Sequence, residues 1–355
     1  MKKILLGLPE DPHPGNSRFT PWTDLTTTCN QSIYHPMHRY YALSTYLRGR
    51  FGVRVQKVPL DAGFTCPNRD GTLSRSGCVF CNPEGSGSGM SKQKLSLSQQ
   101  YAFWTEKFAR KRNAKLFLAY LQSYSNTYAP MPRFREVISE LSGLEHLAGL
   151  CLGTRPDCLE PEKLACLADQ AVPEIWLELG LQSSSDATLQ RINRGHDAAC
   201  FARAVEAAHR LGLKVCAHVM AGLPGEGQKE FLDTIDFVSN LPVAGIKLHN
   251  LYVCRGTVLA SWWRQGNVHL LERAEYIDLV LAALPRLRPD MVIHRLNADP
   301  APGELLAPQW AGHKGDVLRA MAAAIEDADI WQGQSTTPHI PAWYDPAGEH
   351  PGVMA

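Results

Sequence analysis

The feature that most limits the possible folds is a regular alternation of apolar and amphipathic segments that begins at residue 53. Six short apolar segments are typical of strands, and they alternate with longer segments that have helical periodicity. This pattern predicts a parallel sheet with both faces covered. Six units are fewer than the eight of a closed barrel, so the pattern favours an open partial barrel, although a doubly wound sheet stays possible at this point.

The sequence predicts one helix before the first strand and then an alternation of strands and helices. A helix over 38–52 precedes the first strand and stops at Gly52. The strands are expected at 53–63, 115–124, 148–154, 174–183, 213–224 and 245–253. The helices between and after them are expected at 95–112, 134–144, 160–170, 199–212, 229–241 and 271–287.

The composition divides the chain into four parts. Residues 1–35 are rich in Pro, Thr, Asn and Asp and predict an irregular N-terminal extension. Residues 36–290 hold the partial barrel, and residues 291–330 form a C-terminal capping segment with a helix at 314–329. The Pro- and Gly-rich residues 331–355 are expected to be a disordered tail.

Length, charge and hydropathy exclude several classes of protein. The 355 residues are 45% hydrophobic, which is enough for a large core. A formal net charge of +1 excludes a nucleic-acid binder that relies on strong overall basic charge, but not a local basic patch. No apolar run reaches the roughly 18 residues of a membrane-spanning helix, and no secretory signal is evident. We expect a cytoplasmic protein with mostly reduced cysteines.

The segment GFTCPNRDGTLSRSGCVFCNPE, residues 63–84, holds three close cysteines, Cys66, Cys78 and Cys81. It follows the first expected strand, at the end of the sheet where such folds place their chemistry. With a fourth ligand such as Cys29 or a histidine, the three could bind zinc. Alone, they suit three corners of a [4Fe–4S] cluster whose fourth iron is left for a cofactor. The spacing does not separate these two hypotheses.

Further motifs give the chain a family resemblance. Cys78-Val79-Phe80-Cys81 is similar to the cysteine motif of radical S-adenosylmethionine (radical SAM) enzymes. GFTCPNRDGT, ELGLQS, RINRGHD, GLKVCAH, GLPGE, IKLH and RGT resemble the YhcC-like and YtqA-like bacterial subgroup, which is related to the elongator catalytic subunit. That subgroup also has the long spacing between the first two cysteines. The resemblance covers about residues 38 to 330, and Asn297-Ala298 depart from it where Thr-Gly is usual.

The resemblance implies an α/β fold, a partial (β/α)6 TIM-like barrel with extensions at both ends. It implies one [4Fe–4S] cluster on Cys66, Cys78 and Cys81, with S-adenosylmethionine as the second cofactor. An electron from the cluster cleaves this cofactor to a 5′-deoxyadenosyl radical, which takes hydrogen from a substrate. The implied electron donor is of the flavodoxin or ferredoxin type.

The resemblance also implies contacts to S-adenosylmethionine. Phe80 is expected near the adenine, and Ser123 and Tyr124 near the amino group. The other implied contacts are to ribose hydroxyls (Glu178, Gln182 and Ser183), to the methionine carboxylate (Arg191 or Arg194) and to the adenine (Gly222, Gly225 and Leu251).

The substrate is the least constrained part of the prediction. Candidate substrate residues at the strand ends are His218, Lys247, His249, His294 and Arg295, each of which could equally be structural. The subgroup's relatives imply a tRNA and the side chain of its wobble uridine. A basic cluster could follow RNA phosphates or be a solvated surface: Arg48, Arg50, Arg54, Lys107, Arg110, Lys111, Arg112 and Lys115. The alternatives are a small-molecule substrate, or a zinc-binding structural or RNA-binding protein.

Overall fold

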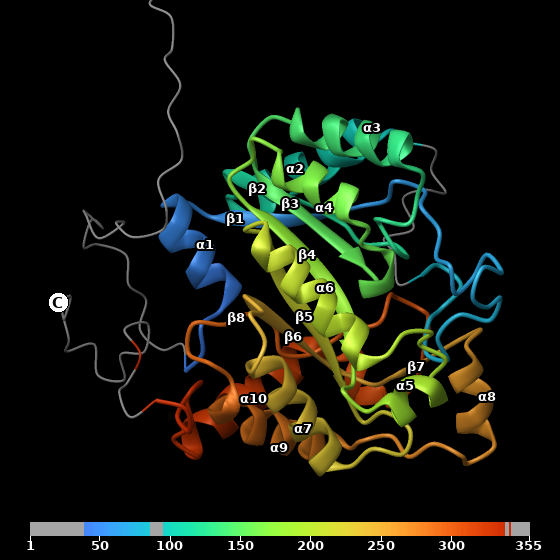
Figure 1. Ribbon diagram of the computed structural model, residues 1–355. Helices are drawn as coiled ribbons and strands as arrows, with labels where there is room; N and C mark the ends of the chain where they lie inside the picture. Colours follow the sequence, from blue (N-terminus) through green and yellow to red (C-terminus); the bar gives the residue numbers. More distant parts are fainter. Residues whose placement is uncertain (1–38, 86–94, 338–340, 342–355) are drawn as a thin grey trace, which may run out of the picture. The chain divides into compact units, whose positions relative to one another are not determined.

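The computed structural model describes residues 39–85, 95–337 and 341. Its main sheet has seven parallel strands in the order β1-β2-β3-β4-β5-β6-β8 (Figure 1). The strands are β1 (Val55–Leu60), β2 (Leu116–Leu121), β3 (Leu147–Thr154), β4 (Ile175–Gln182), β5 (Lys214–Ala221), β6 (Gly245–Asn250) and β8 (Val292–Arg295). The strands of this sheet pair in chain order, with β7 left out, and the sheet curls into the expected partial barrel.

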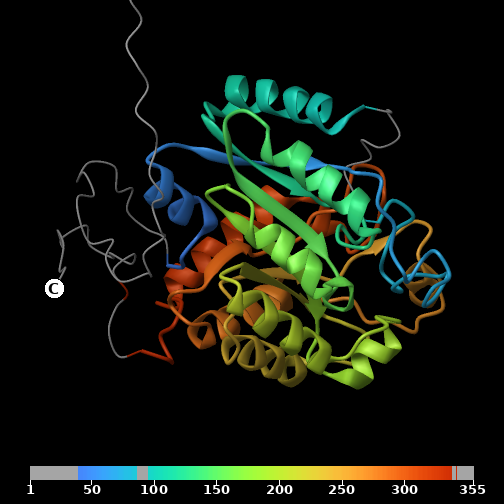
Figure 2. The same ribbon diagram turned by 45° about the horizontal axis from the view of Figure 1, so that its top comes forward.

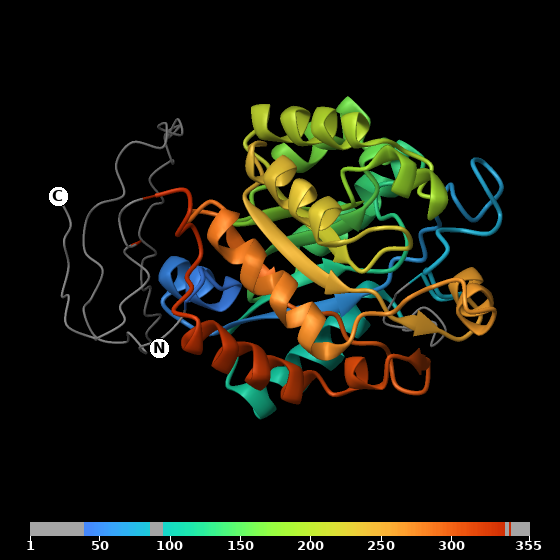
Figure 3. The same cartoon turned by 90° about the horizontal axis from the view of Figure 1, so that it is seen from below.

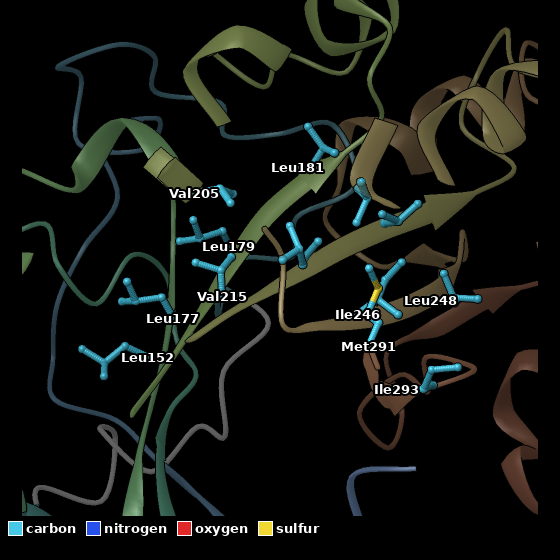
Figure 4. Close-up of a cluster of buried hydrophobic side chains, with 14 of the residues drawn as sticks. Leu152, Leu177, Leu179, Leu181, Val205, Val215, Ile246, Leu248, Met291 and Ile293 are labelled. Carbon is cyan, nitrogen blue, oxygen red and sulfur yellow. The ribbon is translucent and has the colours of Figure 1, made fainter. Parts of the chain in front are cut away.

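Helices cover the outer face of this sheet (Figure 2). They are α2 (Leu97–Arg112), α3 (Met131–Ser142), α4 (Pro161–Ala168), α6 (Ala198–Arg210), α7 (Gln228–Ser239), α9 (Arg273–Ala283) and α10 (Lys314–Asp327). Side chains alternate along a strand, so Leu177, Leu179 and Leu181 of β4 all face these helices (Figure 4). The inner face is concave and encloses a second set of residues, as expected of a partial barrel.

One short helix closes the barrel at the amino ends of its strands. Helix α1 (Leu43–Phe51) places Leu47 in an apolar cluster with Leu118, Trp176 and Val292 from the inner face. The backbone N–H of Ile293 donates to the carbonyl of Tyr41 at 2.8 Å, which fixes the segment that leads into α1. The amino end of the barrel is therefore filled, and only the carboxyl end is open for a ligand.

The structure adds elements that the sequence pattern did not predict. The parallel strand β8 lies within 291–330, which we expected only to cap the barrel. Only four residues long and ending in His and Arg, it has no clear apolar run. The other additions are β7 (Val253–Cys254) paired with β9 (Leu305–Ala307), the helices α5 (Asp186–Arg191) and α8 (Val258–Arg264), and three 3-10 turns, η2 (Pro156–Cys158), η3 (Leu284–Arg286) and η4 (Gln309–Gly312).

The two ends of the chain differ in how far the structure describes them. The expected N-terminal extension, 1–35, lies outside the described residues. The expected disordered tail begins too early at residue 331, because 331–337 pack on the barrel. Buried Gln332 donates to the carbonyl of Met291 at 2.8 Å and accepts from the N–H of Tyr41 at 2.9 Å. Within the described parts, no helix combines the length and apolarity needed to cross a lipid bilayer.

Candidate active site

The cysteine loop leaves β1 at the open end of the barrel and is held at both sides. At its start, the carboxylate of Asp61 accepts from the N–H of Gly63 and from the hydroxyl of Ser123, both at 2.9 Å. Near its end, the N–H of Val79 donates to Ile192 at 3.0 Å and its carbonyl accepts from Leu259 at 2.8 Å. Figures 1 and 3 show the loop at the arrowheads of the strands, opposite α1.

Between this loop and the strand ends lies a pocket that is partly open to solvent and has a cavity volume of about 130 Å³. All three cysteines of the loop line it. The other lining residues are Arg69, Gly77, Phe80, Gly85, Tyr120, Gln122, Tyr124, Gly153, Thr154, Arg155, Glu178, Gly180, Gln182, Arg194 and His218.

Three arginines surround the cysteine thiols. The guanidinium of Arg194 donates to the sulfur of Cys78 at 3.4 Å and to the carbonyl of Gly180 at 2.6 Å. A Cβ on residue 180 would overlap this guanidinium, which explains a glycine there. Arg69 donates to the carbonyl of Cys81 at 2.5 Å.

The third guanidinium has an unused donor. Arg155 forms two hydrogen bonds with Asp157, at 2.9 and 2.7 Å, yet its buried Nη1 has no partner. Burial raises the pKa of Cys66, whereas the positive charges of Arg155 and Arg194 act to lower it. Guanidinium groups around thiolates offset negative charge, as an anionic cluster with three thiolate ligands requires.

The residues present fit a [4Fe–4S] cluster. All three thiols line the same pocket, which is the arrangement that a cluster with three thiolate ligands requires. Cys29, the possible fourth zinc ligand, lies outside the described residues.

Two pocket residues have backbone conformations that side-chain-bearing residues rarely adopt. Tyr124 follows β2 with φ of 59°, and Gln182 ends β4 with φ of 79°. A Cβ on Gly85 would overlap the ring of Tyr124, so the loop and this ring fit closely. Strained residues of this kind concentrate at binding and catalytic sites, where the surrounding structure holds them.

Of the residues expected to contact S-adenosylmethionine, five line the pocket: Phe80, Tyr124, Glu178, Gln182 and Arg194. The other residues expected to contact this cofactor do not line the pocket. Ser123 is bonded to Asp61, and the hydroxyl of Ser183 donates to Glu226 at 2.5 Å. Leu251 belongs to an apolar cluster that anchors the loop.

The glycines of the GLPGE turn also serve this chain's own packing. A Cβ on Gly225 would lie 2.5 Å from Nη1 of Arg191, so Arg191 packs on this turn and does not line the pocket. A Cβ on Gly222 would lie 2.9 Å from the side chain of Leu271.

The sequence assigned no role to several pocket residues, above all Arg69, Tyr120 and Arg155. Gln122, Thr154 and Arg155 are polar residues at strand ends, and this position was the one signal in the sequence that could have identified them as pocket residues. Arg69 lies within the cysteine loop and had no such signal.

The five candidate substrate residues approach the inner face of the barrel, and a carboxylate connects several of them. Glu178 forms ion pairs with Lys57 of β1 and Lys247 of β6, and accepts from His218 at 3.1 Å. His294 lies 3.7 Å from the same carboxylate. Burial acts to raise the pKa of Glu178, but the two ammonium groups hold it well below its usual range. Glu178 is thus part of a charged network, in addition to lining the pocket.

Among those five, His249 and Arg295 are the two without a contact to Glu178 in this network. The ring of His249 lies 5.2 Å from that of His218. Arg295, at the end of β8, lies 3.8 Å from Asp299.

The basic cluster expected near the cysteine loop lies at the opposite end of the barrel. Arg112 ends α2 just before β2 begins, and Arg54 precedes β1. Some of its charges are paired locally, such as Arg50 with Glu174 at 2.8 Å and Arg110 with Glu106 at 3.7 Å. The cluster therefore does not surround the pocket.

Comparisons with known proteins agree with this geometry. Residues 66–238 match the model of the radical SAM superfamily, and residues 243–327 match that of the Radical_SAM C-terminal domain. The chain belongs to the radical SAM superfamily. Protein YhcC of Escherichia coli is 41% identical over 76% of this chain and 86% of its own length. YtqA of Bacillus subtilis is 35% identical over 83% of this chain and 92% of its own length.

More distant relatives share the fold or a part of the sequence. An archaeal Elp3 from Methanocaldococcus infernus superposes with a TM-score of 0.58 at 17% identity, over 68% of this chain and 62% of its own. A tRNA uridine(34) acetyltransferase of Dehalococcoides mccartyi is 34% identical over 34% of this chain and 26% of its own length. Together these matches confirm the expected family, the partial barrel and an enzyme of the radical SAM class.

Proposed function

We propose that the chain binds one [4Fe–4S] cluster through Cys66, Cys78 and Cys81 and cleaves S-adenosylmethionine beside it. The observation that carries this proposal is the single pocket lined by all three thiols and ringed by three guanidiniums. When bound, the cluster supplies an electron that breaks a carbon–sulfur bond of S-adenosylmethionine, so that a 5′-deoxyadenosyl radical can remove hydrogen from the substrate.

The chain's own residues bind and orient the cofactors. Arg194 donates to the sulfur of Cys78 and so fixes its position in the pocket. The unpartnered Nη1 of Arg155 is the better candidate for the methionine carboxylate than Arg191, which packs on Gly225. Phe80, Tyr124 and Gln182 form the walls for the nucleoside. A cytoplasmic electron donor of the flavodoxin or ferredoxin type would reduce the cluster.

The substrate we propose first is a tRNA, modified at the side chain of its wobble uridine. Partial identity to a tRNA uridine(34) acetyltransferase supports this class. The position of the basic cluster, at the filled end of the barrel, gives it no support.

A small molecule is the second candidate substrate, and one observation favours it. The pocket continues to Tyr120, Glu178 and His218 on the inner face, where charged side chains are enclosed by the barrel. A small polar substrate can reach such groups, whereas a folded RNA would have to insert a single nucleotide.

The test is anaerobic reconstitution with iron and sulfide, followed by dithionite and S-adenosylmethionine. We expect a coloured protein that forms 5′-deoxyadenosine, and faster formation when bulk tRNA is added. Formation that tRNA does not change would replace tRNA with a small molecule as the substrate. A colourless protein that retains zinc and forms no 5′-deoxyadenosine would contradict the proposed cluster and restore the structural-zinc alternative.

A further inference from the structure

Below the cysteine pocket, the inner face of the barrel encloses a layer of polar side chains, which we call the inner chamber. Its members come from six strands at alternating, inward-facing positions. They are Lys57, Tyr120, Glu178, His218, Lys247, His249 and His294. Three of them, Tyr120, Glu178 and His218, also line the pocket, so this layer begins at the floor of the pocket.

The charges of the inner chamber do not balance. Glu178 is its one carboxylate, with no exposed side-chain surface, and it is paired with two ammonium groups. Burial and the charge of Lys247 lower the pKa of His218 to about 4, and burial and the charge of Lys57 lower that of His294 to about 3. Because these imidazoles are neutral near pH 7, the chamber retains one positive charge in excess. The exposed fraction is only 7% for the side chain of Lys247 and 17% for that of Lys57.

Hydrogen-bonding groups in the chamber are also unsatisfied. Nε2 of His249 and both ring nitrogens of His294 are buried and have no hydrogen-bond partner. An unsatisfied buried polar group is costly and usually has a ligand, a water or a functional reason. His294 lies 3.7 Å from the carboxylate of Glu178, and the ring of His249 lies 5.2 Å from that of His218.

A nearby carboxylate shows what a satisfied network looks like in this chain. Glu174, just before β4, accepts from Tyr46 at 2.8 Å, Arg50 at 2.8 Å, Lys214 at 2.7 Å and Trp176 at 3.0 Å. Its two cations are better hydrated, with 36% of the Arg50 and 20% of the Lys214 side chain exposed. None of these five side chains has an unsatisfied buried atom among those described.

We propose that the inner chamber binds the anionic group, a carboxylate or a phosphate, of a small substrate that enters through the cysteine pocket. Lys247 and Lys57 provide the charge, and His249 and His294 provide the unused hydrogen-bonding nitrogens. The bound anion balances the excess charge, and the rest of the substrate extends toward the cysteines. This assignment rests on the proposed radical chemistry only for the statement that the ligand is a substrate.

The test measures anion binding without any turnover. Reconstituted holoenzyme with an oxidised cluster and saturating S-adenosylmethionine is titrated calorimetrically with sulfate and with acetate, at ionic strength fixed by chloride. The cofactor's own carboxylate is then already bound. We expect at least one of the two anions to bind, and Lys247→Met to weaken that binding by about tenfold or more, because a buried ammonium is lost.

Matched variants separate an anion site from a structural ion network. Lys214→Met removes an ammonium from Glu174 and is expected to leave the affinity unchanged. Glu178→Gln raises the excess charge and is expected to strengthen binding, opposite in sign to Lys247→Met. If Lys247→Met does not fold, Lys57→Met provides the same comparison. A comparable loss in Lys214→Met, or equal affinity in all variants, would overturn the proposal.

Two further outcomes would also overturn it. One is a parent holoenzyme that binds neither anion. The other is sulfate or acetate that displaces S-adenosylmethionine, because the anions would then occupy the cofactor's carboxylate site. Failure of the proposed radical function is a separate result, since it appears as absent 5′-deoxyadenosine in the reductive assay, and the anion titration can be repeated on protein without a cluster.

Discussion

Glu174 and Glu178 occupy the same strand region of one barrel, yet their surroundings differ in kind. At the amino end, Glu174 is bonded by four side chains and lies under α1, which fills that end. Each carboxylate is paired with two cations, but those of Glu178 are the less exposed, and unsatisfied imidazoles lie in the same layer. The groups bonded to Glu174 are therefore satisfied within the chain, whereas those around Glu178 are left for a ligand.

The backbone shows the same contrast. The strained residues Tyr124 and Gln182 both line the pocket at the carboxyl end. At the amino end, α2 stops at Asn113, whose φ of 50° is an ordinary helix-terminating conformation, and His146 before β3 has a φ of 55°. Tyr124 and Gln182 differ from these two because they line the pocket, where strained residues often support a binding site.

The largest expected effect comes from removing one cysteine at the open end. Cys78→Ala takes away a thiolate that Arg194 contacts, so the protein should lose its cluster iron and all formation of 5′-deoxyadenosine. The barrel should still fold, because Cys78 lies on the loop and not in the sheet. Iron content and the 5′-deoxyadenosine assay measure the first effect, and circular dichroism the second.

The matched control is Cys166→Ala, on α4 and away from the pocket. It should retain iron and activity. Parent-like 5′-deoxyadenosine formation by Cys78→Ala would show that the mechanism is wrong.

The second comparison exchanges each buried carboxylate for its amide. Glu178→Gln and Glu174→Gln each leave two cations without their carboxylate, and such losses cost about 3–5 kcal/mol of unfolding free energy. We expect sulfate to restore part of the stability of Glu178→Gln, since its cations are enclosed with an open pocket above them. Glu174→Gln should gain no such protection, because α1 fills that end. Chemical denaturation with and without sulfate measures the stability of both variants. Equal stabilisation of the two variants by sulfate would show that the two ends of the barrel do not differ in anion binding.

The sequence predicted the outer part of this molecule better than the inner part. Leu177, Leu179 and Leu181 alternate in a clear pattern, so the strand and its helix-facing side could be predicted. On the inner face of the same strand, Glu178 was expected as a cofactor contact, but its ion pairs with Lys57 and Lys247 were not. Which residues meet there depends on five other strands and on the register of the whole sheet.

The candidate site shows the same limit. Cys66, Cys78 and Cys81 were evident because they lie together on one loop. Arg155 follows β3 and Arg194 follows α5, and both reach the cysteines only through the fold. The place of the basic cluster depends on the fold in the same way: Lys107 to Lys115 is near the cysteine loop in sequence, yet α2 carries it to the amino end of the barrel.

A pH series sharpens the contrast by titrating one chamber group. Burial lowers the pKa of Lys247 to about 8, with Lys57 and Arg295 acting in the same direction, and Glu178 and Cys216 in the opposite one. Tyr120 also faces its ammonium, at 3.4 Å. A lysine is positive below its pKa, so the excess charge disappears as the pH rises through about 8. Sulfate affinity of the parent should fall about tenfold over that rise, while Lys247→Met shows no such step.

The smallest expected effect tests whether the strained backbone at the open end is there for the ligand. Gln182→Gly removes the steric cost of a positive φ at a pocket residue, and should change the unfolding free energy by no more than about 1 kcal/mol, toward higher stability. Affinity for S-adenosylmethionine, measured by calorimetry on the oxidised holoenzyme, should fall severalfold, because the side chain and its fixed backbone form one wall of the pocket.

Asn113→Gly makes the same backbone change at the end of α2, far from the pocket, and should leave that affinity unchanged. If Gln182→Gly also leaves the affinity for S-adenosylmethionine unchanged, the strain at residue 182 serves only the turn after β4 and not the cofactor. A loss confined to Gln182→Gly would mean that stability is given up at the open end of the barrel in exchange for a preformed cofactor wall, while the filled end has no reason for such a compromise.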